Sequence, residues 1–297
     1  MRLLSIVVLL LLIPYRAMAH AGGAVPEDLW QHWNLDPLLL IGLLLPLYLY
    51  SRGAMTYPVA RWRTALFITA IATLFIALIS PLDALSGSLF SAHMVQHLLL
   101  ILVAAPLLVV SRPLSPLLRG LPQPWRNAFG SLMQMRSIHL IWARLTAVIV
   151  ILLVHLVALL AWHVPGLYSA AINYHWIHIL EHASFFITAA LYWWVLYTAD
   201  HFGGRILSVF IVMMVSGLLG ALMTFASVPW YLDHVPYVEA WGLTPLEDQQ
   251  LAGLFMWIPA GTLYVAIMAL FLGTWLSALE RKTDEHEQRP VKDMHNA

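Results

Sequence analysis

The chain has no cysteine and few charged residues, and both shortages narrow what it can be. Without cysteine there is no disulfide, thiolate metal site, cysteine nucleophile or CxxC redox motif. Charged residues make up 10% of the chain, whereas a soluble domain carries about 25%. Hydrophobic residues reach 61%, which is typical of a polytopic protein whose surroundings are a lipid bilayer. The formal net charge of zero gives no indication of a nucleic-acid partner.

The N-terminal segment has the shape of a secretory signal. After Arg2 comes an apolar run of about eleven residues, and Ala17-Met18-Ala19 then forms an A-x-A cleavage site. The run is short for a membrane span, which needs about 20 residues. We therefore predict a signal peptide at residues 1–19. An uncleaved anchor is the alternative, because Arg16 lies unusually close to the cleavage site. In either case the segment that follows is exported.

Seven apolar stretches follow, each long enough for a helix that crosses or nearly crosses a bilayer. They lie at about 36–50, 64–80, 92–110, 145–163, 175–197, 206–227 and 250–277. Only helices and closed barrels span hydrocarbon, and these stretches do not alternate as strands do. The sequence therefore predicts an all-α membrane protein, a seven-transmembrane-helix bundle over residues 20–280. Residues 281–297 would form a charged cytoplasmic tail.

Lysine and arginine occur only in alternate loops after the N-terminal segment. They lie between the first and second spans, the third and fourth, the fifth and sixth, and in the tail. The opposite loops, around 81–91, 164–174 and 228–249, have none. The positive-inside rule then predicts an N-out, C-in topology, in agreement with an exported N-terminus.

Histidines gather at the span ends that this topology places outside. His93 and His97 open the third span four residues apart, and His178 and His182 repeat that spacing in the fifth. Residues at i and i+4 lie on one face of a helix, so each pair can offer two imidazoles to one ion. Ionisable groups inside a membrane are costly and indicate function. We therefore predict a shared metal site in the outer layer of the bundle.

Further ligands lie at a similar depth. Met94 follows His93, His163 ends the fourth span, and Met256 lies early in the seventh. Imidazole and thioether ligands suit copper, and thioether favours Cu(I) over zinc. Core packing is the favoured explanation of each methionine taken alone, because methionine is a common gap filler. His163 taken alone is more simply a hydrogen-bonding interfacial histidine.

Two carboxylates accompany these residues. Residues 178–182, HILEH, match the H-x-x-E-H pattern of inverted zinc peptidases, in which Glu181 would be the general base. The match is short and has no catalytic domain around it. We therefore favour Glu181 as a partner that orients a histidine and raises its basicity. Asp248, at the start of the seventh span, is expected either to do the same or to cap that helix.

Four stretches together resemble the polytopic CtaG family, the cytochrome c oxidase assembly factors of the caa3 type. They are HMVQHLLLILVAAPLLVV at 93–110, WHVPGLY at 162–168, HWIHILEH at 175–182 and DQQLAGLFMWIPAG at 248–261. The resemblance implies a seven-helix inner-membrane protein needed for maturation of haem–copper oxidase, with oxidase subunits as partners, and we expect an assembly factor rather than an enzyme. The lack of cysteine separates it from the single-span copper chaperones that share the CtaG name. By motif, the resemblance carries over His93, Met94, His97, His163, His178, Glu181, His182, Asp248 and Met256.

The favoured hypothesis is an assembly factor that holds copper, as Cu(I), at the outer face of the membrane and assists its insertion into the oxidase. Three alternatives remain open. Paired histidines, His97 with His182 or His155 with either of them, could hold haem in a redox protein. A metal permease would need polar groups through the whole bilayer depth, and the inner halves of the spans have almost none. A metal-free scaffold would use the histidines only as hydrogen-bonding groups.

Overall fold

The computed structural model describes residues 23–199 and 202–293, and these residues form helices and loops without a strand. Six helices are long and apolar enough to cross a membrane, and a seventh span results if one bent pair of helices counts as one. The all-α, multi-pass class is therefore confirmed. The predicted signal peptide at 1–19 lies outside the described residues.

The spans follow the predicted stretches closely at most positions. They are α2 (Pro37–Ala54), α3 (Arg61–Leu78), the continuous helix of α5 (Phe90–Leu98), η2 (Leu99–Ala104) and α6 (Ala105–Ser111), α10 (Val148–Trp162), α12 (His175–Thr198), α13 (Phe202–Thr224) and α15 (Pro245–Asp293). Short helices fill the connections: η1 (Leu29–Gln31), α4 (Pro81–Ser88), α7 (Leu114–Gly120), α8 (Gln123–Met133), α9 (Arg136–Leu145), α11 (Pro165–Asn173), α14 (Val235–Val238) and η3 (Glu239–Trp241).

The fourth span differs most from its prediction. The straight helix α10 has 15 residues, and α9, which was expected as a loop, precedes it at an angle of 66°. The break falls at Ala147, whose backbone is extended with ψ at 130°. Arg136 and Arg144 lie at the two ends of α9. Their charge favours water over hydrocarbon, which explains why α9 turns away from the direction of α10.

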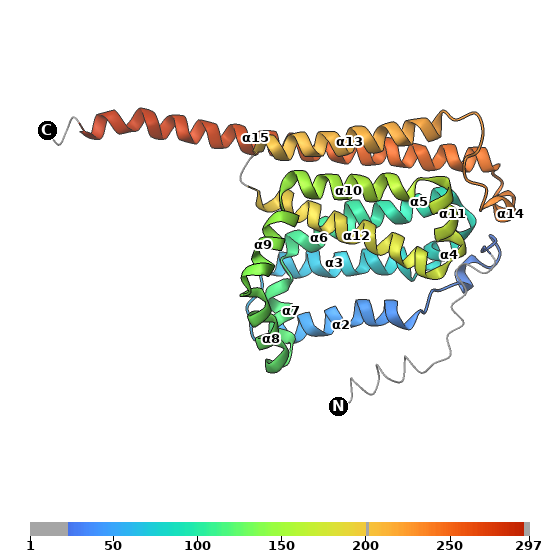
Figure 1. Cartoon of the computed structure of the whole chain (residues 1–297), viewed down its shortest axis with the longest axis horizontal. Helices are drawn as coiled ribbons and strands as arrows, with labels where there is room; N and C mark the ends of the chain where they lie inside the picture. Colours follow the sequence, from blue (N-terminus) through green and yellow to red (C-terminus); the bar gives the residue numbers. More distant parts are fainter. Residues whose placement is uncertain (1–22, 200–201, 294–297) are drawn as a thin grey trace.

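The last helix also differs. The predicted span at 250–277 and the predicted tail belong to one helix, α15, which runs for 49 residues. Its apolar part, Pro245–Arg281, is a candidate span. Beyond that part the helix continues away from the bundle as far as Asp293 (Figure 1).

The bundle has two chemically distinct ends. We name as the arginine end the connections at residues 52–63, 112–144 and 202–205, and α7, α8 and α9 lie there (Figure 1). We name as the histidine end residues 81–97, 163–182 and 228–250, and α4, α11 and α14 lie at this opposite side (Figure 1). The alternation of basic loops along the sequence therefore corresponds to a separation in space.

A π-helical turn, η2, interrupts the third span two residues after His97. The N–H of Ala105 donates to Leu100 O, so the π-type partner of Ile101 O would be residue 106. That residue is Pro106, which has no N–H. The indole of Trp193 in α12 donates to Ile101 O at 2.8 Å and satisfies it. This bond joins α12 to the third span, and π-turns are frequent near functional sites.

Helices α13 and α15 approach each other through two glycines. A Cβ built on Gly220 would lie 2.8 Å from Gly253 O, and one built on Gly253 would lie 2.7 Å from Thr224 N. Only glycine fits at such a backbone contact, which is the small-residue packing common between membrane helices. The contact fixes the first turns of α15, where Met256 lies, against the end of α13.

Candidate metal centre

Helices α5 and α12 bring the four predicted histidines together at the histidine end. The ring centroids are 4.4 Å apart for His93 and His97 and 4.1 Å apart for His178 and His182. Between the helices, the His93 ring lies 5.5 Å from His178 and 5.7 Å from His182. All four side chains are buried. The i, i+4 spacing thus produces two imidazole pairs that face each other.

Glu181 lies between the two pairs. Its Oε2 is 3.5 Å from His93 Nε2 and its Oε1 is 3.7 Å from His97 Nε2. One ligand atom from each of four buried residues lies within 4.8 Å of the other three, and we name these residues the His/Glu group: His93, His178, Glu181 and His182. The sequence suggested a supporting role for Glu181, whereas its oxygens lie among the ligand atoms themselves. Positions 178, 181 and 182 share one helix face, which explains this placement.

The polar atoms of this region are poorly satisfied. Within the described part of the chain, neither oxygen of Glu181 nor any ring nitrogen of His93 and His97 has a hydrogen-bond partner. Contacts of 3.5 and 3.7 Å are longer than the usual 2.7–3.2 Å of an N–H···O bond. Each buried unsatisfied group costs about 1–3 kcal/mol, and such groups in a native fold call for an explanation such as an ion. A cation among these lone pairs would satisfy them together.

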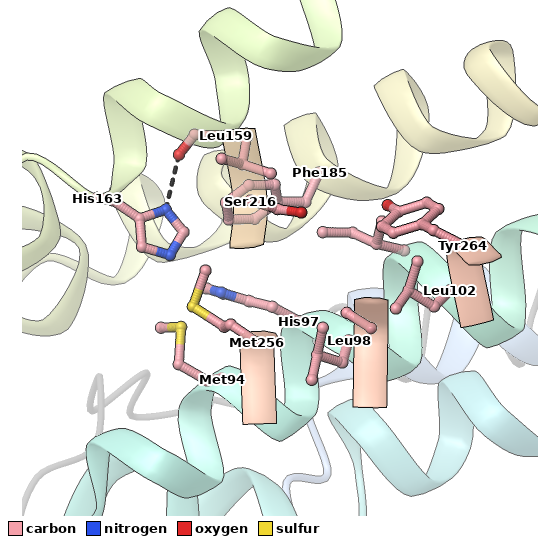
Figure 2. Close-up of a pocket in the computed structure, with 12 residues that line it drawn as sticks. Met94, His97, Leu98, Leu102, Leu159, His163, Phe185, Ser216, Met256 and Tyr264 are labelled. Atoms are coloured by element: carbon pink, nitrogen blue, oxygen red, sulfur yellow. Dashed lines mark hydrogen bonds between the residues drawn. The ribbon is translucent and has the colours of Figure 1, made fainter. Parts of the chain in front are cut away.

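The other predicted ligands line a small cavity beside the His/Glu group. Met94, His97, His163 and Met256 contribute to a cavity of about 30 Å³ between α5, α10, α12, α13 and α15 (Figure 2). Met94 and Met256 are buried, and both pack in one apolar cluster with Met223. The thioethers therefore lie next to the histidine pairs but outside the four-residue group.

Asp248 neither orients a histidine nor caps its own helix, which were the two roles expected from the sequence. Its carboxylate accepts hydrogen bonds from Phe90 N at 2.6 Å and Ser91 N at 3.0 Å. It therefore caps α5 rather than its own helix, α15. A carboxylate at a helix N-terminus is stabilised by the helix dipole and by the free N–H groups there. Asp248 thus holds in place the turn that carries His93.

Residues that sequence reasoning did not identify cover the group. Tyr168 in α11 places its ring against that of His93, with centroids 5.3 Å apart. Its hydroxyl lies 2.6 Å from His234 Nε2, and His234 Nδ1 lies 3.1 Å from Gly87 O. Because a carbonyl only accepts, Nδ1 donates and Nε2 accepts from Tyr168. Burial, and then the charge of Glu181, raise the pKa of Tyr168 well above its usual value, so the phenol stays a donor. A lone loop histidine such as His234 gives no sequence signal for this contact.

One more histidine lies at the rim of the group. His175, at the start of α12, has Nε2 at 3.6 Å from Asp36 Oδ2 and is partly exposed. His178 and His182 follow it on the same helix face. The face therefore leads from a partly exposed imidazole to buried ones.

His155 belongs to a different environment. Its Nδ1 lies 3.0 Å from Thr188 Oγ1, and its ring stacks on Tyr192 at 5.3 Å. It is one of the histidines that a haem hypothesis could pair with His97 or His182. A threonine of α12 holds its Nδ1, and its Nε2 is buried without a hydrogen-bond partner among the described residues.

Comparison with known proteins places the chain in a family. The model of the cytochrome c oxidase caa3 assembly factor family, Caa3_CtaG, matches residues 46–278. Two uncharacterized proteins, from Mycobacterium bovis and Mycobacterium tuberculosis, are each 23% identical over 278 residues, covering 86% of this chain and 41% of theirs. The chain thus spans about two fifths of the length of these relatives. No solved structure matches. The matched range contains both histidine pairs, Glu181 and the two thioethers, and the chain belongs to the cytochrome c oxidase caa3 assembly factor family.

Proposed function

We propose that the protein serves cytochrome c oxidase assembly by binding copper at the His/Glu group and passing it to an oxidase subunit. The feature that supports this most strongly is the buried Glu181 carboxylate between two imidazole pairs, with contacts of 3.5 and 3.7 Å that are too long for hydrogen bonds. Buried charges in proteins are paired or coordinate metals. The family description points to assembly rather than to a reaction, so we propose a carrier and not an enzyme.

The donor set suits copper that must be released. Imidazole suits copper as well as zinc, and the four members of the group supply three imidazoles and one carboxylate. The chain has no cysteine, so no thiolate strengthens the site. A thiolate-free site holds copper less tightly, which favours transfer to an oxidase subunit. Copper is also a constituent of the haem–copper oxidases that the family resemblance implies as partners.

The position of the group supports an outer-face role. It lies at the histidine end, whereas the basic connections lie at the arginine end (Figure 1). Basic loops are retained in the cytoplasm by the positive-inside rule. We therefore propose that the protein is a multi-pass protein of the inner membrane and that the His/Glu group faces the extracytoplasmic side.

Haem fits this region less well than a single ion. The cavity beside the group is about 30 Å³, whereas sites for ligands of drug size measure about 300–1,000 Å³. A porphyrin between α5 and α12 would have to separate helices whose histidine rings are 5.2–5.7 Å apart. The geometry therefore favours a bare metal ion over a haem.

The test is metal analysis of the purified full chain in detergent after loading with Cu(I) under reducing conditions. We expect bound copper, its loss from the His/Glu group in the H178A/H182A double variant, and no Soret band. The H32A/H139A double variant is the matched control, because both of these histidines are exposed and lie away from the group. In cells, H178A/H182A should lower the copper content of the oxidase, whereas H32A/H139A should not.

Three results would contradict the proposal. If H178A/H182A bound as much copper as the unmodified chain, the His/Glu group would not be the copper site. A Soret band in the purified protein would point to haem instead. If the double variant still supported full oxidase assembly, the protein would act as a metal-free scaffold.

A further inference from the structure

We propose that the cavity beside the His/Glu group is a second copper site, selective for Cu(I), with Met94, His97, His163 and Met256 as ligands. This second site rests on the proposed function, because it would bind the same copper ion before the ion is passed to an oxidase subunit. His97 would be a ligand of the second site only, and its ring lies beside the His/Glu group. The first has imidazole and carboxylate ligands, and the second has imidazole and thioether ligands.

The donors of the second site converge on one space. Figure 2 shows the sulfur atoms of Met94 and Met256 and the rings of His97 and His163 on the same side of the cavity. The volume of about 30 Å³ exceeds the 10–15 Å³ that one water-sized sphere requires, so a small ion fits. Both methionine side chains are more than nine-tenths buried. An ion there would be shielded from water.

His163 presents a lone pair to this space. Its Nδ1 lies 2.7 Å from Leu159 O, and a carbonyl accepts only, so Nδ1 carries the hydrogen. The neutral ring then has its lone pair on Nε2. That atom is buried and has no hydrogen-bond partner within the described part of the chain. Tyr231 also fixes the residue, because its hydroxyl donates to His163 O at 2.7 Å. A metal ligand whose other nitrogen is held by a carbonyl is the usual arrangement at metal sites.

His97 lies between the two sites. Its Nε2 is 3.7 Å from Glu181 Oε1, and its side chain also lines the cavity. Neither of its ring nitrogens has a hydrogen-bond partner among the described residues. The ring can therefore accept the ion from the neighbouring His/Glu group, as its ligands change from carboxylate and imidazole to imidazole and thioether. Copper stays Cu(I) throughout, so this ligand exchange needs neither an electron nor a proton.

The lining of the cavity selects for a soft monovalent ion. No carboxylate contributes to it, and the remaining lining is mostly apolar, with Leu98, Leu102 and Phe185 among its members. A divalent ion in such surroundings is costly unless its charge is compensated. Thioether sulfur binds Cu(I) well and zinc poorly. Zinc should therefore occupy only the His/Glu group, whereas Cu(I) should occupy both sites.

Core packing without metal binding is the competing explanation of Met94 and Met256. Met223 allows an experiment that distinguishes packing from metal binding. Met223 is fully buried and packs in the same apolar cluster as Met94 and Met256, but it does not line the cavity. Replacing methionine by leucine nearly conserves volume and usually costs less than about 1.5 kcal/mol. The M94L/M256L double variant should therefore fold, and M223L is its control.

The experiment loads the full chain in detergent with Cu(I), and separately with Zn²⁺, and records metal content and copper X-ray absorption. We expect about two Cu(I) but about one Zn²⁺ per chain, with sulfur in the copper coordination shell. In M94L/M256L, copper should fall to about one per chain and the sulfur signal should disappear, with zinc unchanged. M223L should match the unmodified chain. H178A/H182A should lose zinc but keep sulfur-bound copper.

The outcomes separate this inference from the proposed function. The second site would be overturned if M94L/M256L bound as much copper as the unmodified chain, or if copper in the unmodified chain had no sulfur ligand. Neither result would contradict the His/Glu group. Zinc and copper binding that H178A/H182A leaves unchanged would overturn the His/Glu group while sulfur-bound copper still supports the second site. Equal loss of sulfur signal in M223L and M94L/M256L would show that packing, not ligation, is disturbed, and would also overturn it.

Discussion

The two ends of the bundle treat their polar residues in opposite ways. At the histidine end, His93 and Glu181 are fully buried and their contact is too long for a hydrogen bond. At the arginine end, exposed cations lie over aromatic rings, with Arg112 5.0 Å from the Tyr197 ring and Arg119 4.6 Å from the Tyr57 ring. Water solvates the second set, whereas the first set is removed from water.

This difference shows which end of the bundle contains polar groups whose burial lowers the stability of the fold. A buried unsatisfied polar group costs about 1–3 kcal/mol, whereas an exposed cation over a ring contributes about 0.5–1 kcal/mol. The histidine end is thus destabilised by polar atoms of His93, His97 and Glu181 without hydrogen-bond partners among the described residues, and such atoms suit a binding site. The basic residues of the arginine end are the feature from which we propose that this end faces the cytoplasm. Four predictions test this contrast, from the largest expected effect to the smallest.

The largest effect is expected from G120A at the arginine end. A Cβ at Gly120 would collide with the backbone carbonyl of Leu49, where α7 packs on α2. A backbone atom cannot move aside as a side chain can, so the variant should lose at least about 3 kcal/mol of stability. Thermal unfolding and yield in detergent measure this loss.

The control for that variant is G130A in α8, where an added Cβ meets nothing within 4 Å. Alanine is a better helix former than glycine, so G130A should gain up to about 1 kcal/mol. Similar behaviour of the two variants would show that the contact between α2 and α7 is not as close as the structure has it.

The next effect is expected from E181Q at the histidine end. The amide keeps the shape of Glu181 but loses its charge, so copper affinity should fall about 10–100-fold. Without metal, the variant should be as stable as the unmodified chain or more so, because an ionisable carboxyl group buried without a hydrogen-bond partner in the described part of the chain is replaced by a neutral amide. Copper titration against a competing chelator and thermal unfolding of the metal-free protein measure the two effects. A destabilised variant with unchanged affinity would mean that Glu181 serves the fold rather than the ion.

A smaller effect is expected from D248N. Asp248 accepts two backbone hydrogen bonds at the start of α5, and the amide loses their charge assistance. We expect a loss of about 1–2 kcal/mol in thermal unfolding, with weaker copper binding because His93 is less firmly placed. E280Q, at an exposed position of α15, is the control and should change neither property. Equal unfolding of D248N and E280Q would contradict the capping role.

The smallest effect is expected from R112Q. Arg112 donates to Tyr197 Oη at 3.1 Å and lies over its ring, but the contact is exposed. Its loss should lower stability by less than about 1 kcal/mol and leave copper binding unchanged. If R112Q lost as much stability as D248N, the contrast between the two ends of the bundle would be contradicted.

The sequence predicted most of the spans and the residues of the site, because both depend on local patterns. Long apolar runs located α2, α3, α12 and α13 to within a few residues. The i, i+4 histidine pairs identified α5 and α12 as the helices that carry the candidate ligands. The bend before α10 was missed, because the apolar run continues through Ala147 without a turn signal. The continuation of α15 into the charged tail was missed because charge does not by itself end a helix.

The roles within the site were less predictable. Glu181 was expected beside the ligands and lies among them, and Asp248 caps a helix 157 residues away in sequence. The contact of Tyr168 with His234 also joins distant segments, 66 residues apart. Such contacts depend on which helices become neighbours, and no local pattern records that choice.

By itself the sequence determined the membrane class, the alternation of basic loops, and which side chains could bind a metal. These follow from composition and helical period, which are local properties of the chain. Tertiary structure alone decided that Glu181 joins three imidazoles, and that Met94 and Met256 meet His97 and His163 at a separate cavity. Helix packing sets those distances, because a side chain's neighbours on other helices depend on the rotation and depth of each helix in the bundle.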